Sequence, residues 1–153
     1  VVQAGMSKKW NDQVVLYAQA TAGVYRHELP LYSSQPAAGF PAPGDDEVEE
    51  TLDVNDLLVD DPATTFFVRV QGDSMEGAGI FSGDILVVDR AASVRDGVIV
   101  VAAVYGEMVV KRLTTRAGRQ LLTSEQVGYE PIDITDNDDC WIWGVVTGSV
   151  RVF

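Results

Sequence analysis

Residues 97–113 read GVIVVAAVYGEMVVKRL, and the fold class follows from this stretch. Two runs rich in β-branched and apolar residues flank the pair Tyr105-Gly106, which has the composition of a tight turn. The stretch therefore predicts a β-hairpin with strands at 97–104 and 107–113.

Shorter runs of the same kind lie on both sides of this hairpin. They predict strands at 65–70, 84–89, 121–123, 132–134 and 141–146. Polar turns rather than long helices separate these runs, which is typical of antiparallel sheets. We expect a mainly β fold with antiparallel sheets forming a partly closed barrel. One short helix is predicted over about 55–60, and a second is possible in the same acidic stretch.

The N-terminal part of the chain differs from the rest in charge. Residues 1–38 carry three basic and two acidic side chains, whereas residues 39–153 carry 8 and 21. The segment around the boundary contains three prolines, which block regular pairing. We therefore expect an extended arm at 1–38, a prolyl linker at 39–44 and a β domain at 45–153. The apolar run within the arm, at 14–17, is compatible with one short helix or strand.

Composition excludes several classes of function. The chain has 153 residues and a net charge of −12, which argues against direct, specific DNA binding because phosphate contacts need clustered basic residues. One cysteine, Cys140, and one histidine, His27, exclude a disulfide framework and leave too few soft ligands for zinc. No run approaches the roughly 18 apolar residues of a membrane span, and no signal peptide opens the chain. We expect a cytoplasmic setting, no membrane and no metal or other cofactor.

Lys111 is a candidate catalytic residue because no other lysine follows residue 9. It lies in a predicted strand whose neighbours are nearly all apolar. A buried lysine can lose its proton and act as a general base near neutral pH. The alternative is an exposed strand lysine whose aliphatic stem covers apolar surface.

Ser74 follows the predicted strand at 65–70 through a sharp Gly72-Asp73 turn. A serine at a strand-to-helix junction exposes its hydroxyl, and the free N–H groups beside it can stabilise an oxyanion. The alternative is a plain helix N-cap. Ala38-Gly39 lies in an extended segment whose backbone a protease could bind as an added strand, although ordinary flexible linkers have the same composition.

Taken together, these residues resemble a known family. The motifs are Ala38-Gly39-Phe40-Pro41-Ala42-Pro43, Gly72-Asp73-Ser74-Met75, Gly83-Asp84-Ile85-Leu86-Val87-Val88-Asp89 and Val110-Lys111-Arg112-Leu113. In this order, with 36 residues from Ala38 to Ser74 and 37 from Ser74 to Lys111, they are similar to UmuD-type members of the LexA group of self-cleaving Ser–Lys peptidases. The resemblance runs from about residue 29 to the C-terminal strand. One departure is Ala38, where UmuD has cysteine before the scissile glycine.

The resemblance implies a site and a set of partners. Ser74 would be the nucleophile, Lys111 the general base, and the backbone N–H groups of Asp73 and Ser74 the oxyanion hole. The chain would cut itself between Ala38 and Gly39. The implied activator is a RecA filament on single-stranded DNA, and the implied product is a homodimer that joins a UmuC-type Y-family polymerase for synthesis past lesions.

Two alternatives stay open at the level of the sequence. The first is the C-terminal self-cleavage domain of a LexA-like or phage repressor, which the long arm favours. The second is a non-catalytic docking module of the same fold, in which Ser74 is only a cap and the acidic surface binds a basic partner.

Overall fold

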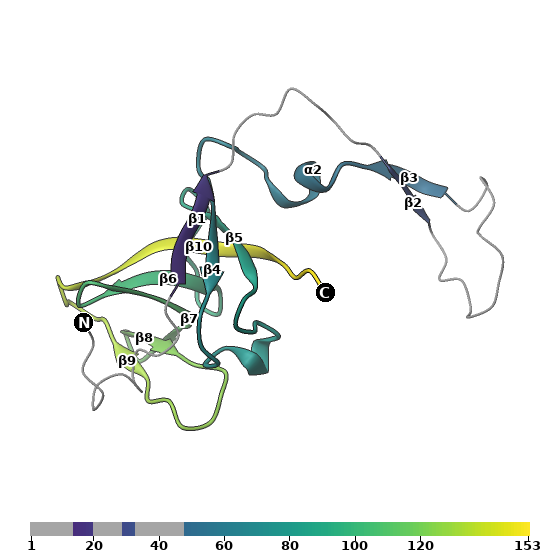
Figure 1. Ribbon diagram of the computed structural model, residues 1–153. Coiled ribbons are helices and arrows are strands. Elements are labelled where there is room, and N and C mark those ends of the chain that lie inside the picture. Colours follow the sequence, from purple (N-terminus) through teal and green to yellow (C-terminus); the bar gives the residue numbers. More distant parts are fainter. Residues whose placement is uncertain (1–13, 20–28, 33–47) are drawn as a thin grey trace.

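A computed structural model describes residues 14–19, 29–32 and 48–153, and Figure 1 shows the order of the elements. The strands are β1 (Val14–Gln19), β2 (Leu29–Tyr32), β3 (Val48–Leu52), β4 (Thr65–Val70), β5 (Ile85–Asp89), β6 (Ile99–Val104), β7 (Glu107–Arg116), β8 (Arg119–Thr123), β9 (Ile132–Asp133) and β10 (Cys140–Val150). The helical elements are α2 (Val54–Leu58) and a single 3₁₀ turn, η2 (Glu76–Ala78).

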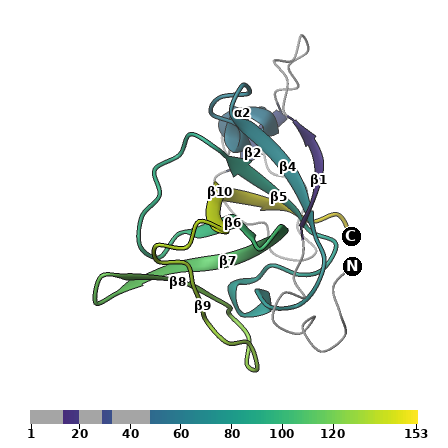
Figure 2. The ribbon, with the colours of Figure 1, turned by 90° about the vertical axis from the view of Figure 1, so that its left-hand side faces the viewer.

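Eight strands form the main sheet, in the order β1-β4-β5-β10-β6-β7-β8-β9. All of its ladders are antiparallel. The sheet curls, so that β1 also approaches β7, but among the described residues no ladder joins the edge strands β1 and β9. The expectation of a mainly β, antiparallel and incompletely closed fold is confirmed, and Figure 2 shows the curled sheet from the side.

The hairpin predicted from residues 97–113 is present. Strand β6 pairs with β7 from Ile99↔Arg112 to Val104↔Glu107. Tyr105 has φ 47° and Gly106 has φ 83°, so both turn residues adopt the left-handed conformation that a two-residue hairpin turn of type I′ requires.

Strand β10 is longer than the predicted 141–146, because its pairing with β5 continues through Gly148 to Val150. The strand runs from Cys140 to Val150 and pairs with β6 in its first half and with β5 in its second. Register shifts occur before Gly144 and before Gly148. A Cβ atom on Gly144 would lie 2.6 Å from Val88 Cγ1, so glycine permits the close approach of β5 there.

The acidic stretch before the main sheet differs from the prediction of one or two short helices. Residues 48–52 form strand β3, which pairs with β2 in a separate two-stranded ribbon that lies apart from the main sheet in Figure 1. The predicted helix is present as α2, but it ends at Leu58 because Val59 has an extended conformation. It begins where Asp53 Oδ1 accepts a hydrogen bond of 2.8 Å from the Asn55 N–H.

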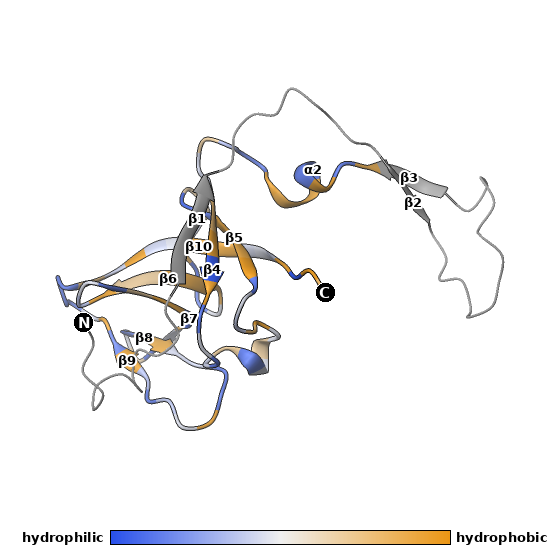
Figure 3. Cartoon of the chain, in the orientation of Figure 1, coloured by the Kyte–Doolittle hydropathy of each residue, from blue (hydrophilic) through white to orange (hydrophobic). Residues whose placement is uncertain are grey.

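The core lies on both faces of the central strands. Val100 and Val109 pack in one apolar cluster, whereas the adjacent residues Val101 and Val110 pack in another. Successive side chains of a strand point to opposite faces, so β6 and β7 are buried on both sides. Figure 3 shows the corresponding hydrophobic colouring along β5 and β6. Lys111, one residue after Val110, is therefore placed in the interior.

Candidate functional site

The turn after β4 places Ser74 inside the molecule. The Val70 N–H donates to the Asp84 carbonyl over 2.9 Å, and the Gly83 N–H donates to the Val70 carbonyl over 2.8 Å, so the chain returns tightly from the turn to β5. Ser74 has 0% relative exposure and Met75, in the apolar core, has 1%. The expectation of an exposed hydroxyl is therefore wrong, because the core closes over the turn.

The helix-cap alternative for Ser74 is also wrong. The element that follows is the three-residue η2 turn, its N-cap residue is Met75, and no side chain makes a capping hydrogen bond there. The Ser74 hydroxyl instead accepts a hydrogen bond of 3.0 Å from Lys111 Nζ.

Lys111 reaches this hydroxyl from the middle of β7, opposite Val100 of β6. Its relative exposure is 1%, which excludes the alternative of an exposed strand lysine. Burial among apolar strands disfavours the charged form of an amine, and a proton-accepting lysine needs that effect. The structure thus brings together Ser74 and Lys111, which are 37 residues apart in the sequence.

Ser124 is a third member of this cluster that the sequence argument missed. Lys111 Nζ donates to Ser124 Oγ over 2.9 Å. The ladder between β7 and β8 pairs Arg112 with Thr123, so the next step of the same register sets Lys111 against Ser124. The signal that could have revealed it is the Ala117-Gly118 turn, because a tight turn there fixes this register.

The segment after β8 covers the nucleophile turn. The Glu125 N–H donates to the Ser74 carbonyl over 2.8 Å, and the Gly77 N–H donates to the Glu125 carbonyl over 2.7 Å. The Glu125 carboxylate also pairs with Arg112 of β7. The turn that carries Ser74 and the segment that carries Ser124 are therefore joined by backbone hydrogen bonds.

Tyr129 lies at the far end of the same segment. Its ring centroid is 5.1 Å from Lys111 Nζ, and its hydroxyl donates to the carboxylate of Asp73. Asp73 itself is exposed, and its carbonyl accepts a hydrogen bond from the Glu76 N–H. The role predicted for the Asp73 backbone N–H, as an oxyanion donor, stays a prediction.

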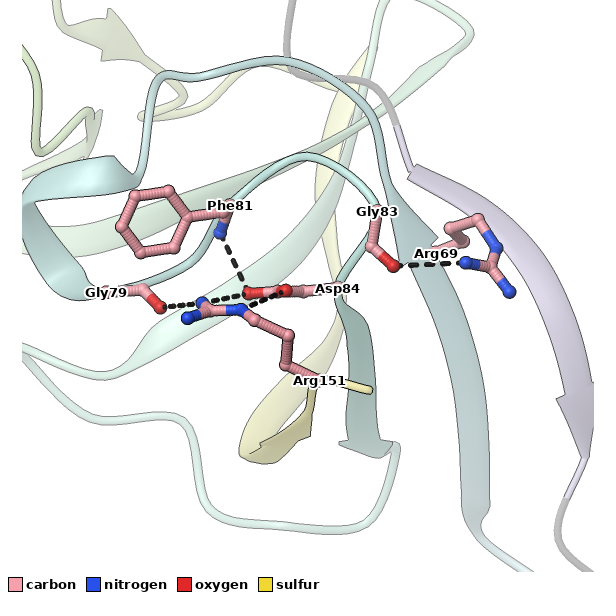
Figure 4. Close-up of polar contacts among 6 residues, drawn as sticks. All are labelled: Arg69, Gly79, Phe81, Gly83, Asp84 and Arg151. Carbon is pink, nitrogen blue, oxygen red and sulfur yellow. Dashed lines mark hydrogen bonds and ion pairs between the residues drawn. The ribbon is translucent and has the colours of Figure 1, made fainter. Parts of the chain in front are cut away.

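An ion pair between the buried Asp84 and the partly exposed Arg151 lies at the end of the turn that follows Ser74, as Figure 4 shows. Arg151 contacts the Asp84 carboxylate through Nε and through Nη2, each over 2.7 Å, and its Nη2 also donates to the Gly79 carbonyl. The Phe81 N–H donates to the same carboxylate over 2.9 Å. Hydrogen bonding to the Arg151 guanidinium outweighs burial and lowers the pKa of Asp84 from its usual 3.8.

The remaining predicted residues fall outside this cluster. Ala38 and Gly39, the predicted cleavage site, lie outside the described residues, as does His27. Cys140 is buried, and burial raises the pKa of its thiol, so it is not an activated nucleophile. Over the described ranges, no group of three His, Cys, Asp or Glu side chains is arranged to hold a metal ion. None of the helices in those ranges is long and apolar enough to cross a membrane.

Comparison with known proteins defines the class. Residues 30–147 match the family described as Peptidase S24-like. The chain therefore belongs to the S24-like peptidases, a family of self-cleaving serine peptidases.

Individual relatives show which members of the family this chain resembles. The chain is 41% identical to Protein MucA of Salmonella typhimurium over 127 residues, which cover 81% of this chain and 85% of MucA. It is 48% identical to Protein ImpA of Shigella flexneri over 122 residues, 80% of this chain and 83% of ImpA. Both are SOS mutagenesis proteins of the UmuD type, so the resemblance expected from the sequence is confirmed. The LexA repressor of Bordetella parapertussis is 39% identical over 148 residues, 96% of this chain and 68% of that repressor.

Proposed function

We propose that this protein is a self-cleaving serine peptidase of the SOS response that cuts its own Ala38–Gly39 bond. The observation that carries the proposal is the 3.0 Å contact between Lys111 Nζ and Ser74 Oγ inside the body. A nucleophile and a base within hydrogen-bond reach, shielded from water, are what acyl transfer by a Ser–Lys pair requires.

The reaction follows from these groups in two halves. The neutral Lys111 amine accepts the proton of Ser74 Oγ, and the oxygen attacks the carbonyl carbon of Ala38. The backbone N–H groups of Asp73 and Ser74 stabilise the resulting oxyanion. The C–N bond to Gly39 then breaks, and the Lys111 ammonium returns its proton to the departing amine. Water hydrolyses the Ala38 ester of Ser74 and regenerates the hydroxyl.

Cleavage at this bond would divide the chain into the arm, residues 1–38, and a trimmed protein, residues 39–153, that begins with the prolyl linker at 39–44. Strand β1 belongs to the arm and is held to β4 by an antiparallel ladder. The arm would therefore stay bound through hydrogen bonds after the cut, and its departure would uncover one edge of the main sheet. No cofactor takes part in this scheme.

The trimmed protein would act as a homodimeric accessory subunit of a UmuC-type Y-family polymerase in the cytoplasm. An acidic body suits that role, because the polymerase supplies the DNA contacts. A RecA filament on single-stranded DNA would promote the cut. These partners come from the resemblance to UmuD-type proteins.

The test is incubation of the chain near neutral pH with RecA, single-stranded oligonucleotide and ATP, with a Ser74→Ala chain as the matched control. We expect a fragment that begins at Gly39 from the unmutated chain alone, and only when RecA is filamentous. A chain that stays intact with an active filament would overturn the RecA-stimulated role.

A second candidate function is the self-cleavage domain of a LexA-like repressor. The observation that favours it is the LexA match, which extends over almost the whole of this chain, the arm included. A repressor needs a DNA-binding module ahead of the arm. Mass spectrometry of the natural protein in cells of its source decides between the two, because a repressor would be heavier by roughly 60–70 residues, about the size of a small folded module.

A further inference from the structure

The Lys111 amine has a second polar contact besides the nucleophile. Its Nζ lies 3.0 Å from Ser74 Oγ and 2.9 Å from Ser124 Oγ, and as an ammonium it donates to both. When the amine loses the proton that it directs at Ser74, two N–H bonds and one lone pair remain. An N–H that stays bonded to Ser124 Oγ then fixes the rotation of the amine, so that the lone pair faces Ser74.

Tyr129 acts on the same amine in a different way. Its ring lies 5.1 Å from Nζ, within the range in which the negative face of an aromatic ring stabilises a cation. The ring therefore favours the ammonium form, whereas burial of Lys111 favours the neutral amine. These two effects oppose each other at the atom that must accept the proton.

Both residues lie on one segment that cannot move independently of the nucleophile turn. Backbone hydrogen bonds join Glu125 to Ser74 and Gly77 to Glu125. A Cβ atom on Gly77 would lie 2.2 Å from the Glu125 carbonyl oxygen, so only glycine allows this close approach. A movement of the segment would change the contacts of Ser74, Ser124 and Tyr129 together.

We propose that Ser124 and Tyr129 are positioning residues for the self-cleavage reaction. Ser124 orients the Lys111 amine toward Ser74, and the Tyr129 ring sets how readily that amine gives up its proton. The inference rests on the proposed function and deepens it. It makes the segment 124–129 a part of the body that sets the rate of self-cleavage, Ser124 raising it and the Tyr129 ring lowering it near neutral pH.

Two charged contacts among the described residues lie beside this amine. Asp73 accepts from the Tyr129 hydroxyl, and Glu125 pairs with Arg112 next to Lys111 on β7. Val100 of β6, opposite Lys111, is apolar. A change of Tyr129 must therefore separate the ring from the hydroxyl that holds Asp73, which two different substitutions achieve.

The test is the first-order rate of self-cleavage as a function of pH, without activator, in full-length variants. Ser124→Ala should lower the maximal rate by about tenfold or more, because misplaced reacting groups are costly. Ser124→Thr keeps the hydroxyl and should restore most of the rate. Val127→Ala is the matched control, since Val127 lies in the same segment and is 97% exposed. It should leave both the rate and the pH midpoint unchanged.

Tyr129→Leu removes the ring and should lower the midpoint of the pH–rate profile by about half a pH unit or more, so that cleavage at neutral pH rises. Tyr129→Phe keeps the ring and removes the bond to Asp73, and should leave the midpoint near that of the unmutated chain. A purely structural role would change the rate and the melting temperature without moving the midpoint.

The outcomes separate the inference from the function on which it rests. If the unmutated chain cleaves and Ser74→Ala does not, while Ser124→Ala and Tyr129→Leu follow the unmutated profile, the inference alone is wrong. A chain that does not cleave at any pH overturns both. Equal midpoints for Tyr129→Leu and Tyr129→Phe would show that the ring does not affect the protonation of Lys111. An inactive Ser124→Thr that folds normally would show that the hydroxyl does not orient the amine.

Discussion

Two buried ionisable groups of this protein have opposite surroundings. Asp84 has its carboxylate against the guanidinium of Arg151 and the Phe81 N–H. Lys111 has its amine against two hydroxyls and the face of an aromatic ring. An arginine holds a carboxylate firmly in its charged form, whereas a hydroxyl can exchange a proton with an amine. The comparison suggests that the first site maintains the fold and the second performs chemistry.

The largest effect should follow from Lys111→Met, which keeps the length of the side chain and removes the amine. Cleavage should fall by about a hundredfold or more because the general base is lost. Stability in urea should stay the same or increase, since an apolar side chain suits a buried position at least as well. A marked loss of stability with unchanged cleavage would mean that Lys111 maintains the fold and does not take part in the chemistry.

Gly77→Ala should disturb the contact between the turn that carries Ser74 and the segment 124–129. The added Cβ cannot fit beside the Glu125 carbonyl, so we expect a loss of about 1–3 kcal/mol in unfolding free energy. Slower cleavage should accompany it, because the segment that carries Ser124 must shift. Chemical denaturation and the cleavage rate measure the two effects, and wild-type values for both would show that the contact is not tight.

Asp84→Asn should reduce stability without removing the catalytic groups. The amide keeps the volume of the carboxylate but loses the charged hydrogen bonds to Arg151, at a cost of about 2 kcal/mol. Urea denaturation at neutral pH measures it. A variant as stable as the unmutated chain would mean that the ion pair contributes nothing to the fold.

The same pair predicts a dependence of stability on pH. The pKa of Asp84 is lower in the folded chain than its usual 3.8, so the unfolded chain binds its proton more tightly. The stabilisation is therefore complete above about pH 4 and is lost as the pH falls from 3.8 through the folded value. Melting curves of the unmutated chain and Asp84→Asn should converge as the pH is lowered through this range, and a constant difference would contradict the assignment.

The smallest effect should come from the exposed pair Arg119–Asp133. Hydrogen bonding to Arg119 lowers the pKa of Asp133 to about 2, but solvent screens the pair. Asp133→Asn should change the melting temperature less than Asp84→Asn does at every pH above 4. A larger change would mean that the surface pair, rather than the Asp84–Arg151 pair, stabilises the body.

The sequence predicted the elements that local patterning controls. The apolar runs on both sides of Tyr105-Gly106 specified the hairpin, and the single lysine within one of them pointed to Lys111. It did not predict strand β3, because its alternation is short and acidic and it is paired only by a distant strand. The continuation of β10 past Val146 was also missed, since pairing with β5 carries the strand through Gly148 to Val150.

Within the site, the sequence argument identified the residues but not their surroundings. The hydroxyl of Ser74 was expected to be exposed, and it is buried, because packing of the turn under segment 124–129 is a tertiary property. Ser124 was missed for the same reason, as it reaches Lys111 only through the register of β7 and β8.

The most direct test of the central claim is the intact mass of the chain after incubation at about pH 10, where even a lysine of ordinary pKa, about 10.4, is partly deprotonated. Chains carrying Ser74→Ala or Lys111→Ala are measured beside it. The account predicts two fragments, 1–38 and 39–153, from the unmutated chain and none from either variant. Cleavage that persists in Ser74→Ala, or an unmutated chain that remains whole, would contradict it.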